Sequence, residues 1–548
     1  MRSFLFATSL TLLTTAACTD APAELKDPPI LKVTSPQRSL IQSGAGAVVV
    51  TGTVSPNPES GEPVEKVLVN NVQATLNADG TFTATVSIKP GATLIHTEAR
   101  DAAGQKAEDT RAVHAGQLRP VGANIEDALQ VAMSKNAFAK LSAAAGPMIE
   151  SIDLGAMLAP MQPMARWSDE TGEDCNFARY FVDDVNLGNV EISIVPSLQG
   201  LQFRAQIDNL DVASHARYSL VCADGTNNVR IKAPKVVVAG TLVVTPSGNQ
   251  GFKTALTNET VQITGLDIQA GGIPGDIIDF LNLDTAAGWI ISKAAPLAME
   301  PMMNKALGGL AGPQTIDMMG KSLTMEVDPT SIDIDGNGAM ISLSTKMVIA
   351  GSESSPGFIF TDNGLPALDA GQGFAMGLAD DLANEMMAEV KAIGLLNLHM
   401  PAEAGSFNET AMEMTLPPLL SADPADGKMK VIIGDMITTY MDHGTPVGRA
   451  AINASIDLQI VPASNGYGVA IQLGTPTAHV DVLDDIANAT RLSNEDLANA
   501  TEVSLNAQIA AISKLLVAIP MPSVAGLQMK NVSLGADDGY VMLKGEIE

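Results

Sequence analysis

Apolar and polar residues alternate along the stretch Val190–Asp211, and Pro196 interrupts the alternation near its middle. A period of two places the apolar side chains on one face of an extended chain. Proline lacks a backbone N–H, so it favours a bend or the edge of a sheet. The stretch therefore predicts two strands around a bend, with one face buried.

The N-terminus has the pattern of an export signal. Arg2 precedes the apolar run 4–13, and small residues precede Cys18. This order is typical of a secretory signal peptide, and the run is too short for a permanent transmembrane helix. We therefore expect a signal peptide over residues 1–17 and export of the remaining chain.

The tetrapeptide Thr15–Cys18 resembles a bacterial lipobox, in which the cysteine becomes the lipidated first residue. This resemblance implies lipidation of Cys18, a tether over residues 18–30 and membrane attachment through the lipid anchor. Thr19 after the cysteine implies, by the same resemblance, a bacterial outer membrane lipoprotein that faces the periplasm or the cell surface. The alternative is an ordinary signal peptide cleaved after Ala17.

Composition restricts the partners. The 548 residues are enough for three or four domains, and the formal net charge is -29. Such a charge repels nucleic acid and anionic headgroups at long range, so we expect no nucleic-acid partner. The chain is 46% hydrophobic but only 4% aromatic. Its Gly and Pro content and its alternating patterns are typical of a β-rich globular protein.

Cys175 and Cys222 are the other two cysteines, and they flank a block of predicted strands. An exported chain reaches an oxidising compartment, where a disulfide can form. Their pairing is the only intramolecular option that leaves Cys18 for lipid, so we predict it. A metal site with two thiols is the rival, and the absence of nearby histidines or further cysteines counts against it.

Residues 31–114 carry short strand patterns at regular spacing, as in a β-sandwich. Turn residues such as Asn70-Asn71 and Asp79-Gly80 separate them. The pattern resembles bacterial Ig-like domains of cell-surface proteins, which implies a spacer. The strands that we expect are 47–54, 64–69, 82–88 and 92–99.

Residues 119–548 repeat one plan twice, which indicates an internal duplication. Each half has a helix, then strands, then a second helix. Apolar residues recur at a spacing of four in Ile125–Ala145 and again in Phe374–Leu398, so both are predicted helices, with Asn124 as the N-cap of the first. The other expected elements are strands over 177–244, a helical region over 276–310, a strand over 451–460, a helix over 493–519 and strands over 521–547.

Three segments in this order resemble the bactericidal/permeability-increasing protein family, also called the tubular lipid-binding (TULIP) superfamily. They are 190–211, the helix Asp380–Leu398 and the C-terminal stretch Ile512–Ile547. In the last stretch, the positions that fit the family pattern are Pro520, Pro522, Gly526, Leu527, Asn531 and Tyr540.

This resemblance implies an α+β fold with two TULIP-type barrels, each a twisted antiparallel sheet around a long helix. A central sheet, to which residues 317–349 contribute, would join them. With the all-β Ig-like sandwich in front, the first barrel would cover residues 117–320. The central sheet and second barrel would cover residues 321–548.

The resemblance also implies that apolar side chains on the helices contact lipid. For any single one of these residues, however, packing in the protein core is the better explanation. Acyl chains would displace water from such a lining, and methionine adapts to irregular apolar shapes. The candidate lipid-contact residues are Ile125, Leu129, Met133, Leu297, Met299, Met302, Met303, Leu382, Met386, Met387 and Val390.

The sequence contains only weak matches to motifs for metal binding or catalysis. The segment Asp333–Gly338 fits the opening of a calcium loop, but its twelfth position is Ser344, so a hairpin turn is the better account. The pair Asp380-Asp381 is best explained as a solvated edge or a partner of the helix dipole. The six histidines form no metal-spaced pair, and no nucleophile-elbow, zincin or phosphate-loop pattern occurs. We therefore expect no metal, no cofactor and no enzyme activity.

The sequence thus favours a lipid-binding, and by extension lipid-transfer, lipoprotein of the bacterial cell envelope. Its partner would be a phospholipid or another amphipathic lipid held in the barrels. The alternative is a cell-surface interaction or adhesion scaffold without a lipid ligand, whose protein partners the sequence does not identify.

Overall fold

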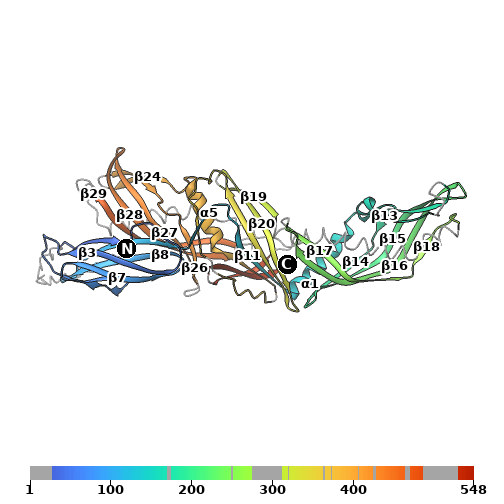
Figure 1. Cartoon of the computed structure of the whole chain (residues 1–548), viewed down its shortest axis with the longest axis horizontal. Helices are drawn as coiled ribbons and strands as arrows, with labels where there is room; N and C mark the ends of the chain where they lie inside the picture. The colour runs from blue at the N-terminus through green and yellow to red at the C-terminus, as the bar shows by residue number, and fades with distance from the viewer. Residues whose placement is uncertain are drawn as a thin grey trace, which may run out of the picture. The chain divides into compact units, whose positions relative to one another are not determined.

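The chain is mostly antiparallel β-sheet with a few helices (Figure 1). It divides into two compact units, the first of residues 1–36, 49–86 and 96–109 and the second of residues 37–48, 87–95 and 110–548. The computed structural model describes residues 27–168, 175–248, 251–274, 312–318, 320–361, 364–371, 373–404, 407–423, 428–462, 469–485, 501, 529–537 and 539–547.

The N-terminal strands form two sheets with the orders β1-β3-β7-β6 and β2-β9-β8-β4-β5. Burial alternates along β3, so one face of this strand is covered, and the strands expected from the sequence are confirmed. Asn70 and Asn71 both have positive φ angles in the tight turn after β4, where asparagine is tolerated. The strands are β1 (Ile30–Ser35), β2 (Leu40–Gln42), β3 (Gly46–Ser55), β4 (Val64–Val69), β5 (Val72–Gln73), β6 (Thr75–Leu76), β7 (Thr81–Ile88), β8 (Gly91–Asp101) and β9 (Lys106–Ala115).

A seven-stranded sheet with the order β19-β20-β21-β11-β23-β31-β30 forms the middle of the second unit. Residues 317–349 contribute to this sheet, as expected from the sequence. Asp335 lies in the turn between β20 and β21, where its carboxylate accepts hydrogen bonds from the backbone of Asn337 and Gly338, so the hairpin interpretation is confirmed. The strands are β11 (Ile125–Ser134), β19 (Gly312–Met318), β20 (Lys321–Ile334), β21 (Gly338–Ile349), β23 (Phe374–Ala379), β30 (Met529–Asp537) and β31 (Tyr540–Ile547). A separate short pair joins β10 (Gln117–Arg119) to β22 (Phe358–Phe360).

Two strands of this sheet run directly into helices. Strand β11 leads into α1 (Lys135–Glu150), and β23 leads into α5 (Asp380–Ala392). The two strands pair antiparallel, with Leu129 opposite Leu378. Each half also adds a hairpin to this sheet: β20–β21 lies beside β11, and β30–β31 lies beside β23. The duplication is therefore built around this central strand pair.

The two predicted long helices are wrong in their first parts. Ile125, Leu129 and Met133 lie on strand β11, and Ser134 rather than Asn124 caps the helix that follows. Leu378 likewise lies on strand β23. A spacing of four satisfies a period of two as well as a period of 3.6, so pairing between distant strands decides the conformation.

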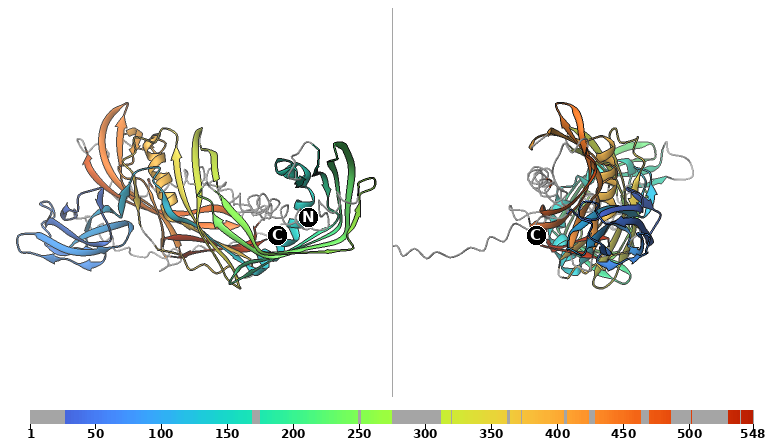
Figure 2. Two further views of the ribbon diagram at one scale, coloured as in Figure 1. Left: turned by 45° about the vertical axis from the view of Figure 1, so that its right-hand side comes forward. Right: turned by 90° about the vertical axis from the view of Figure 1, so that its left-hand side faces the viewer.

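Each half also contains a large sheet of its own. The first curls as a half-barrel, seen in the green strands of Figure 2, and has the order β12-β13-β15-β16-β17, with β14 paired to β15 and β18 to β16. Its strands are β12 (Ala165–Ser168), β13 (Phe177–Asn186), β14 (Val190–Ser197), β15 (Gly200–Leu220), β16 (Ala223–Pro246), β17 (Phe252–Thr264) and β18 (Asp267–Gln269), and the short helices α2 (Leu154–Leu158) and η1 (Ala159–Met161) precede it.

The second large sheet has the order β24-β25-β27-β28-β29, with β26 paired to β27. The strand predicted over 451–460 is confirmed as part of β28, where Ile452, Ala454 and Ile456 are buried, although Ala451 and Asn453 between them are buried as well. The strands are β24 (Leu398–Ala404), β25 (Phe407–Glu413), β26 (Leu419–Asp423), β27 (Lys428–Asp442), β28 (Thr445–Pro462) and β29 (Val469–Asp485). The helices predicted over 276–310 and 493–519 fall, apart from residue 501, outside the described residues.

A buried ion network ties residues 37–48 to the second large sheet within the second unit. Arg38 donates to Asp435 Oδ1 at 2.9 Å and to Asp481 Oδ2 at 3.0 Å. The side chain of Asn453 accepts a hydrogen bond from the backbone N–H of Asp435 and donates to the carbonyl of Thr110. Since the two aspartates are buried, these bonds compensate their loss of water.

Candidate functional site

An apolar face runs across four strands of the first large sheet. Cross-strand pairing places apolar side chains in rows, because directly opposite residues point to the same face. The rows lie on β14, β15, β16 and β17 and comprise Pro196/Leu201/Leu242/Leu256, Ile192/Ala205/Val238/Val261 and Val190/Ile207/Val236/Ile263. We call these twelve residues the first apolar face.

The first apolar face becomes more exposed toward β17. Leu201 and Leu242 are buried on the inner strands, while their neighbour Leu256 on β17 is partly exposed. The same holds for Val261 and Ile263. The face therefore keeps apolar surface that the described residues do not fully cover.

Helix α1 packs along strand β14 at very short distance. A Cβ atom on Gly146 would lie only 2.2 Å from the carbonyl oxygen of Val190, so only glycine fits there. The backbone N–H of Val190 donates to Glu150 Oε1 at 2.7 Å, and that of Ile194 donates to Ser142 Oγ at 2.8 Å. The helix thus supplies acceptors to the edge of β14 with which no strand of the described residues pairs.

The second half has a corresponding apolar face on β27, β28 and β29. Its rows are again formed by directly opposite residues, Met436/Ile452/Val480 and Ile433/Ala454/Ala478. All six residues are buried and belong to one hydrophobic cluster. Helix α5 contacts the edge strand β26 as α1 contacts β14, with the backbone N–H of Leu420 donating to Asn384 Oδ1 at 2.8 Å.

Helix α5 turns its acidic side inward. Asp381, Glu385 and Glu389 recur at a spacing of four, and all three are buried. Their carboxylates accept hydrogen bonds from backbone N–H groups of three distant segments, at Thr361, Gly122 and Ile349 respectively. The interpretation of Asp380-Asp381 as a solvated edge is therefore wrong, because both side chains are buried, although both do lie in the first turn of the helix.

Burial shifts the proton affinity of these carboxyl groups. Loss of water raises the pKa of Glu385 to about 8, and the hydrogen bond from Gly122 opposes the shift without cancelling it. Loss of water likewise raises the pKa of Glu389. On the apolar side of the same helix Leu382, Met386 and Met387 remain partly exposed.

The residues predicted to contact lipid fall into three groups. Ile125 and Met133 are buried in the core, and Leu129 is partly buried beside it. Among the α5 residues, Val390 is buried while Leu382, Met386 and Met387 are partly exposed. The third group, like Cys18, lies outside the described residues: Leu297, Met299, Met302 and Met303.

Cys175 and Cys222 form a disulfide, with their Cα atoms 4.0 Å apart. Cys222 and Val221 both have positive φ in the turn between β15 and β16, which is rare for a β-branched residue. The backbone N–H of Val221 donates to Asn176 Oδ1 at 2.9 Å. The disulfide and this hydrogen bond together hold the turn to the start of β13.

The first apolar face was only partly foreseen from the sequence, which indicated alternation in 190–211 but placed the lipid contacts on helices. The buried carboxylates of α5 were missed. Their regular spacing of four was visible in Asp381, Glu385 and Glu389, but it is also the spacing of a solvated helix face.

Comparison with known proteins gives one family match and several structural similarities. Residues 29–117 match the family model described as glucodextranase, domain B. The chain is similar to a crystal structure of lipopolysaccharide binding protein, with 11% identity and a TM-score of 0.38, over 77% of this chain and 99% of the other.

It is also similar to P47 of Clostridium botulinum E1, with 10% identity and a TM-score of 0.28, over 77% of this chain and 98% of the other. For P47 from Clostridium botulinum A2 the identity is 11% and the TM-score 0.23, over 76% and 96% of the chains. A search of curated proteins finds no match. Within the described ranges, no helix has the length and apolarity needed to cross a membrane.

Proposed function

We propose that this protein binds amphipathic lipids, with acyl chains lying against the first apolar face and the partly exposed side of α5. The proposal assigns binding rather than catalysis. The observation that carries it is the first apolar face, whose rows continue across four strands and stay partly exposed at β17.

The dimensions and chemistry of this face suit an acyl chain. From Leu201 to Ile207 the first apolar face is about 20 Å long on β15, at roughly 3.3 Å per residue. Each methylene group that leaves water contributes about 0.8 kcal/mol, so a long acyl chain gains several kcal/mol without headgroup contacts. The opposite side of the strand is polar, with Gln202 and Arg204 exposed.

Helix α5 supports the same function in the second half. Its polar side chains are buried against backbone donors, and this leaves Leu382, Met386 and Met387 on the partly exposed side. Flexible methionine side chains can adapt to an acyl chain. We therefore propose that each half is a lipid-binding barrel of the TULIP type.

The proposal includes export and a membrane tether. The Cys175–Cys222 disulfide supports an oxidising compartment outside the cytoplasm. Lipidation of Cys18 in the bacterial outer membrane would hold the body near its lipid source and raise the effective concentration of that source. Such a tethered binder is suited to passing phospholipid between membranes or storing it.

Native mass spectrometry tests the proposal on the mature chain from Thr19, purified without detergent. We expect an additional mass that extracts as a phospholipid or fatty acid. A chain that carries no lipid and takes up no fluorescent fatty acid or phospholipid would refute lipid binding and favour a scaffold for protein partners.

A pair of neighbouring substitutions on β17 tests where lipid binds. Ile263→Gln places an amide on the first apolar face, so uptake of the fluorescent lipid should fall several-fold. Gln262→Ala changes the exposed side of the same strand and should leave uptake unchanged. Equal uptake by both variants would place the lipid elsewhere.

A further inference from the structure

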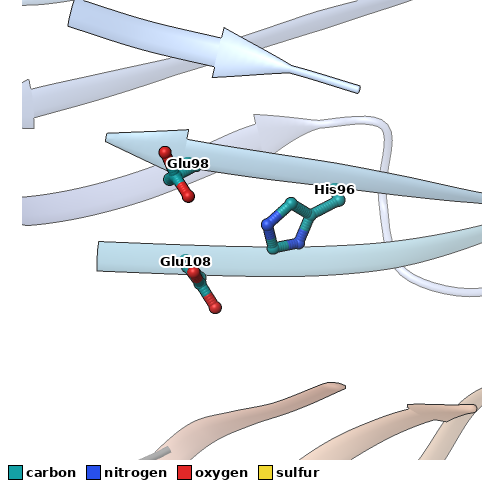
Figure 3. Close-up of side chains that lie close together, drawn as sticks. All are labelled: His96, Glu98 and Glu108. Carbon is teal, nitrogen blue, oxygen red and sulfur yellow. The ribbon is translucent and has the colours of Figure 1, made fainter. Parts of the chain in front are cut away.

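Three side chains of residue types that can ligate a metal lie close together on the N-terminal strand pair β8–β9. His96 and Glu98 stand two residues apart on β8, and Glu108 lies on β9, which is paired beside it in the same sheet. One ligand atom from each lies within 4.8 Å of the other two (Figure 3). All three residues belong to the first compact unit.

The backbone and burial fix these groups in place. The backbone N–H of His96 donates to Asn70 Oδ1 at 2.8 Å, and the N–H of Asn70 donates back to the carbonyl of His96. Glu98 is buried and Glu108 is partly buried. The ligand set is thus held on paired strands rather than on a loop, which favours a defined geometry.

Two cationic side chains balance the charge of the carboxylates. Arg100 pairs with Glu98, and Lys106 Nζ lies 3.0 Å from Glu108 Oε1 and 3.9 Å from Glu98 Oε2. The side chains of Lys106 and Arg100 are 56% and 41% exposed, against 11% for Glu98. A divalent ion could therefore displace the exposed cations while the carboxylates stay in place.

We propose that His96, Glu98 and Glu108 form a binding site for a divalent transition-metal ion of the zinc class. One imidazole nitrogen with two carboxylate oxygens matches the ligand preference of zinc, whereas calcium and magnesium prefer oxygen ligands alone. Water would complete the coordination. Binding bridges β8 to β9, so the metal stabilises the folded N-terminal sandwich.

Zinc titration of the mature full chain by calorimetry tests the site. We expect one zinc ion per chain and weak or no binding of Ca²⁺ and Mg²⁺. Titration with Co²⁺ should give visible absorption bands that disappear in His96→Ala. Absence of zinc binding by the wild-type chain would refute the proposal.

Three variants separate a metal site from an ion-pair network. His96→Ala should weaken zinc binding about tenfold or more. Loss of a residue that only hydrogen-bonds to a metal ligand already weakens metal binding by about tenfold, and loss of a ligand should cost at least as much. Lys106→Gln should strengthen it, since a competing cation is lost. His399→Ala is the matched control, because His399 lies 3.4 Å from Glu409 in a pair outside this group, and zinc binding should not change.

The Lys106 variant decides the interpretation. If Lys106→Gln weakens zinc binding, or if His96→Ala binds zinc like the wild type, the three side chains do not hold the metal. Thermal unfolding in the presence of a chelator checks that each variant is folded. For a variant that passes this check, a loss of zinc binding cannot be attributed to a loss of structure.

Discussion

The carboxylate oxygen Oε1 of Glu385 accepts a hydrogen bond from the backbone nitrogen of Gly122 at 2.7 Å, in the interior of the second unit. Burial raises the pKa of this carboxyl group to about 8, from an ordinary value of 4.5. The folded protein therefore keeps a proton on Glu385 at neutral pH that the unfolded chain has released.

This proton makes stability depend on pH. Between pH 4.5 and 8 the folded state binds more protons at Glu385 than the unfolded state does. The contribution of Glu385 to the free energy of unfolding is therefore complete below pH 4.5 and is lost as the pH rises through 8. In Glu385→Gln this contribution disappears. Urea unfolding at pH 5 and pH 8 should show the variant gaining stability relative to the wild type by a few kcal/mol as pH rises. A constant difference across this range would contradict the assignment.

His114 gives the opposite pH dependence. Its ring is buried on β9, and neither nitrogen has a hydrogen-bond partner among the described residues. Burial lowers the pKa of His114 from 6.5 to about 4. As the pH falls, His114 takes up a proton in the unfolded chain before it does so in the folded protein. Its contribution to the free energy of unfolding is therefore complete above pH 6.5 and is lost as the pH falls toward 4.

The variant His114→Leu should remove this acid sensitivity. Between pH 6.5 and 5 the wild type should lose about 2 kcal/mol of unfolding free energy at this site, and the variant should not. Denaturant unfolding at the two pH values measures the difference. His443→Leu is the control, because the side chain of His443 is exposed. An equal acid response in both variants would rule out His114 as the source.

Local patterns predicted the strands well and the helices poorly. The alternation in 190–211 identified β14 and β15, because a strand with one buried face has apolar residues at every second position. Leu129 and Met133 fit a helix equally well by their spacing. Their strand conformation depends on pairing with Leu378 and Phe374, more than 200 residues away, which a local pattern does not contain.

The buried side of α5 could not be predicted for a related reason. A carboxyl group is buried where hydrogen-bond donors, or a retained proton, compensate its loss of water. For Asp381, Glu385 and Glu389 these donors are backbone N–H groups of segments that meet the helix only in the folded chain. The sequence shows the acidic stripe but not its partners, so the solvated interpretation was the natural one.

The Cys175–Cys222 disulfide should contribute strongly to stability. It closes a loop with a sequence separation of 47, for which loop entropy predicts at most about 4 kcal/mol. The double variant Cys175→Ser with Cys222→Ser should unfold at lower denaturant concentration than the oxidised wild type. Reduced wild type should behave like the variant. A variant as stable as the oxidised protein would mean that the hairpin pairing of β15 with β16 alone fixes the turn.

Gly146 tests the contact between α1 and β14. Alanine is favoured over glycine in a helix by about 1 kcal/mol, so propensity alone predicts that Gly146→Ala stabilises the protein. The new Cβ would lie 2.2 Å from the carbonyl oxygen of Val190, and the backbone cannot yield easily there. The helix must move away from the strand, which weakens the hydrogen bonds of Glu150 and Ser142 to β14.

We therefore expect Gly146→Ala to lower the unfolding free energy by roughly 1–3 kcal/mol, the usual cost of overpacking. Ala143→Gly at an exposed position of the same helix is the reference, and it should cost only the propensity difference. Denaturant unfolding of the two variants compares the effects directly. If Gly146→Ala is more stable than the wild type, the helix tolerates displacement and its close approach to β14 is not required for the fold.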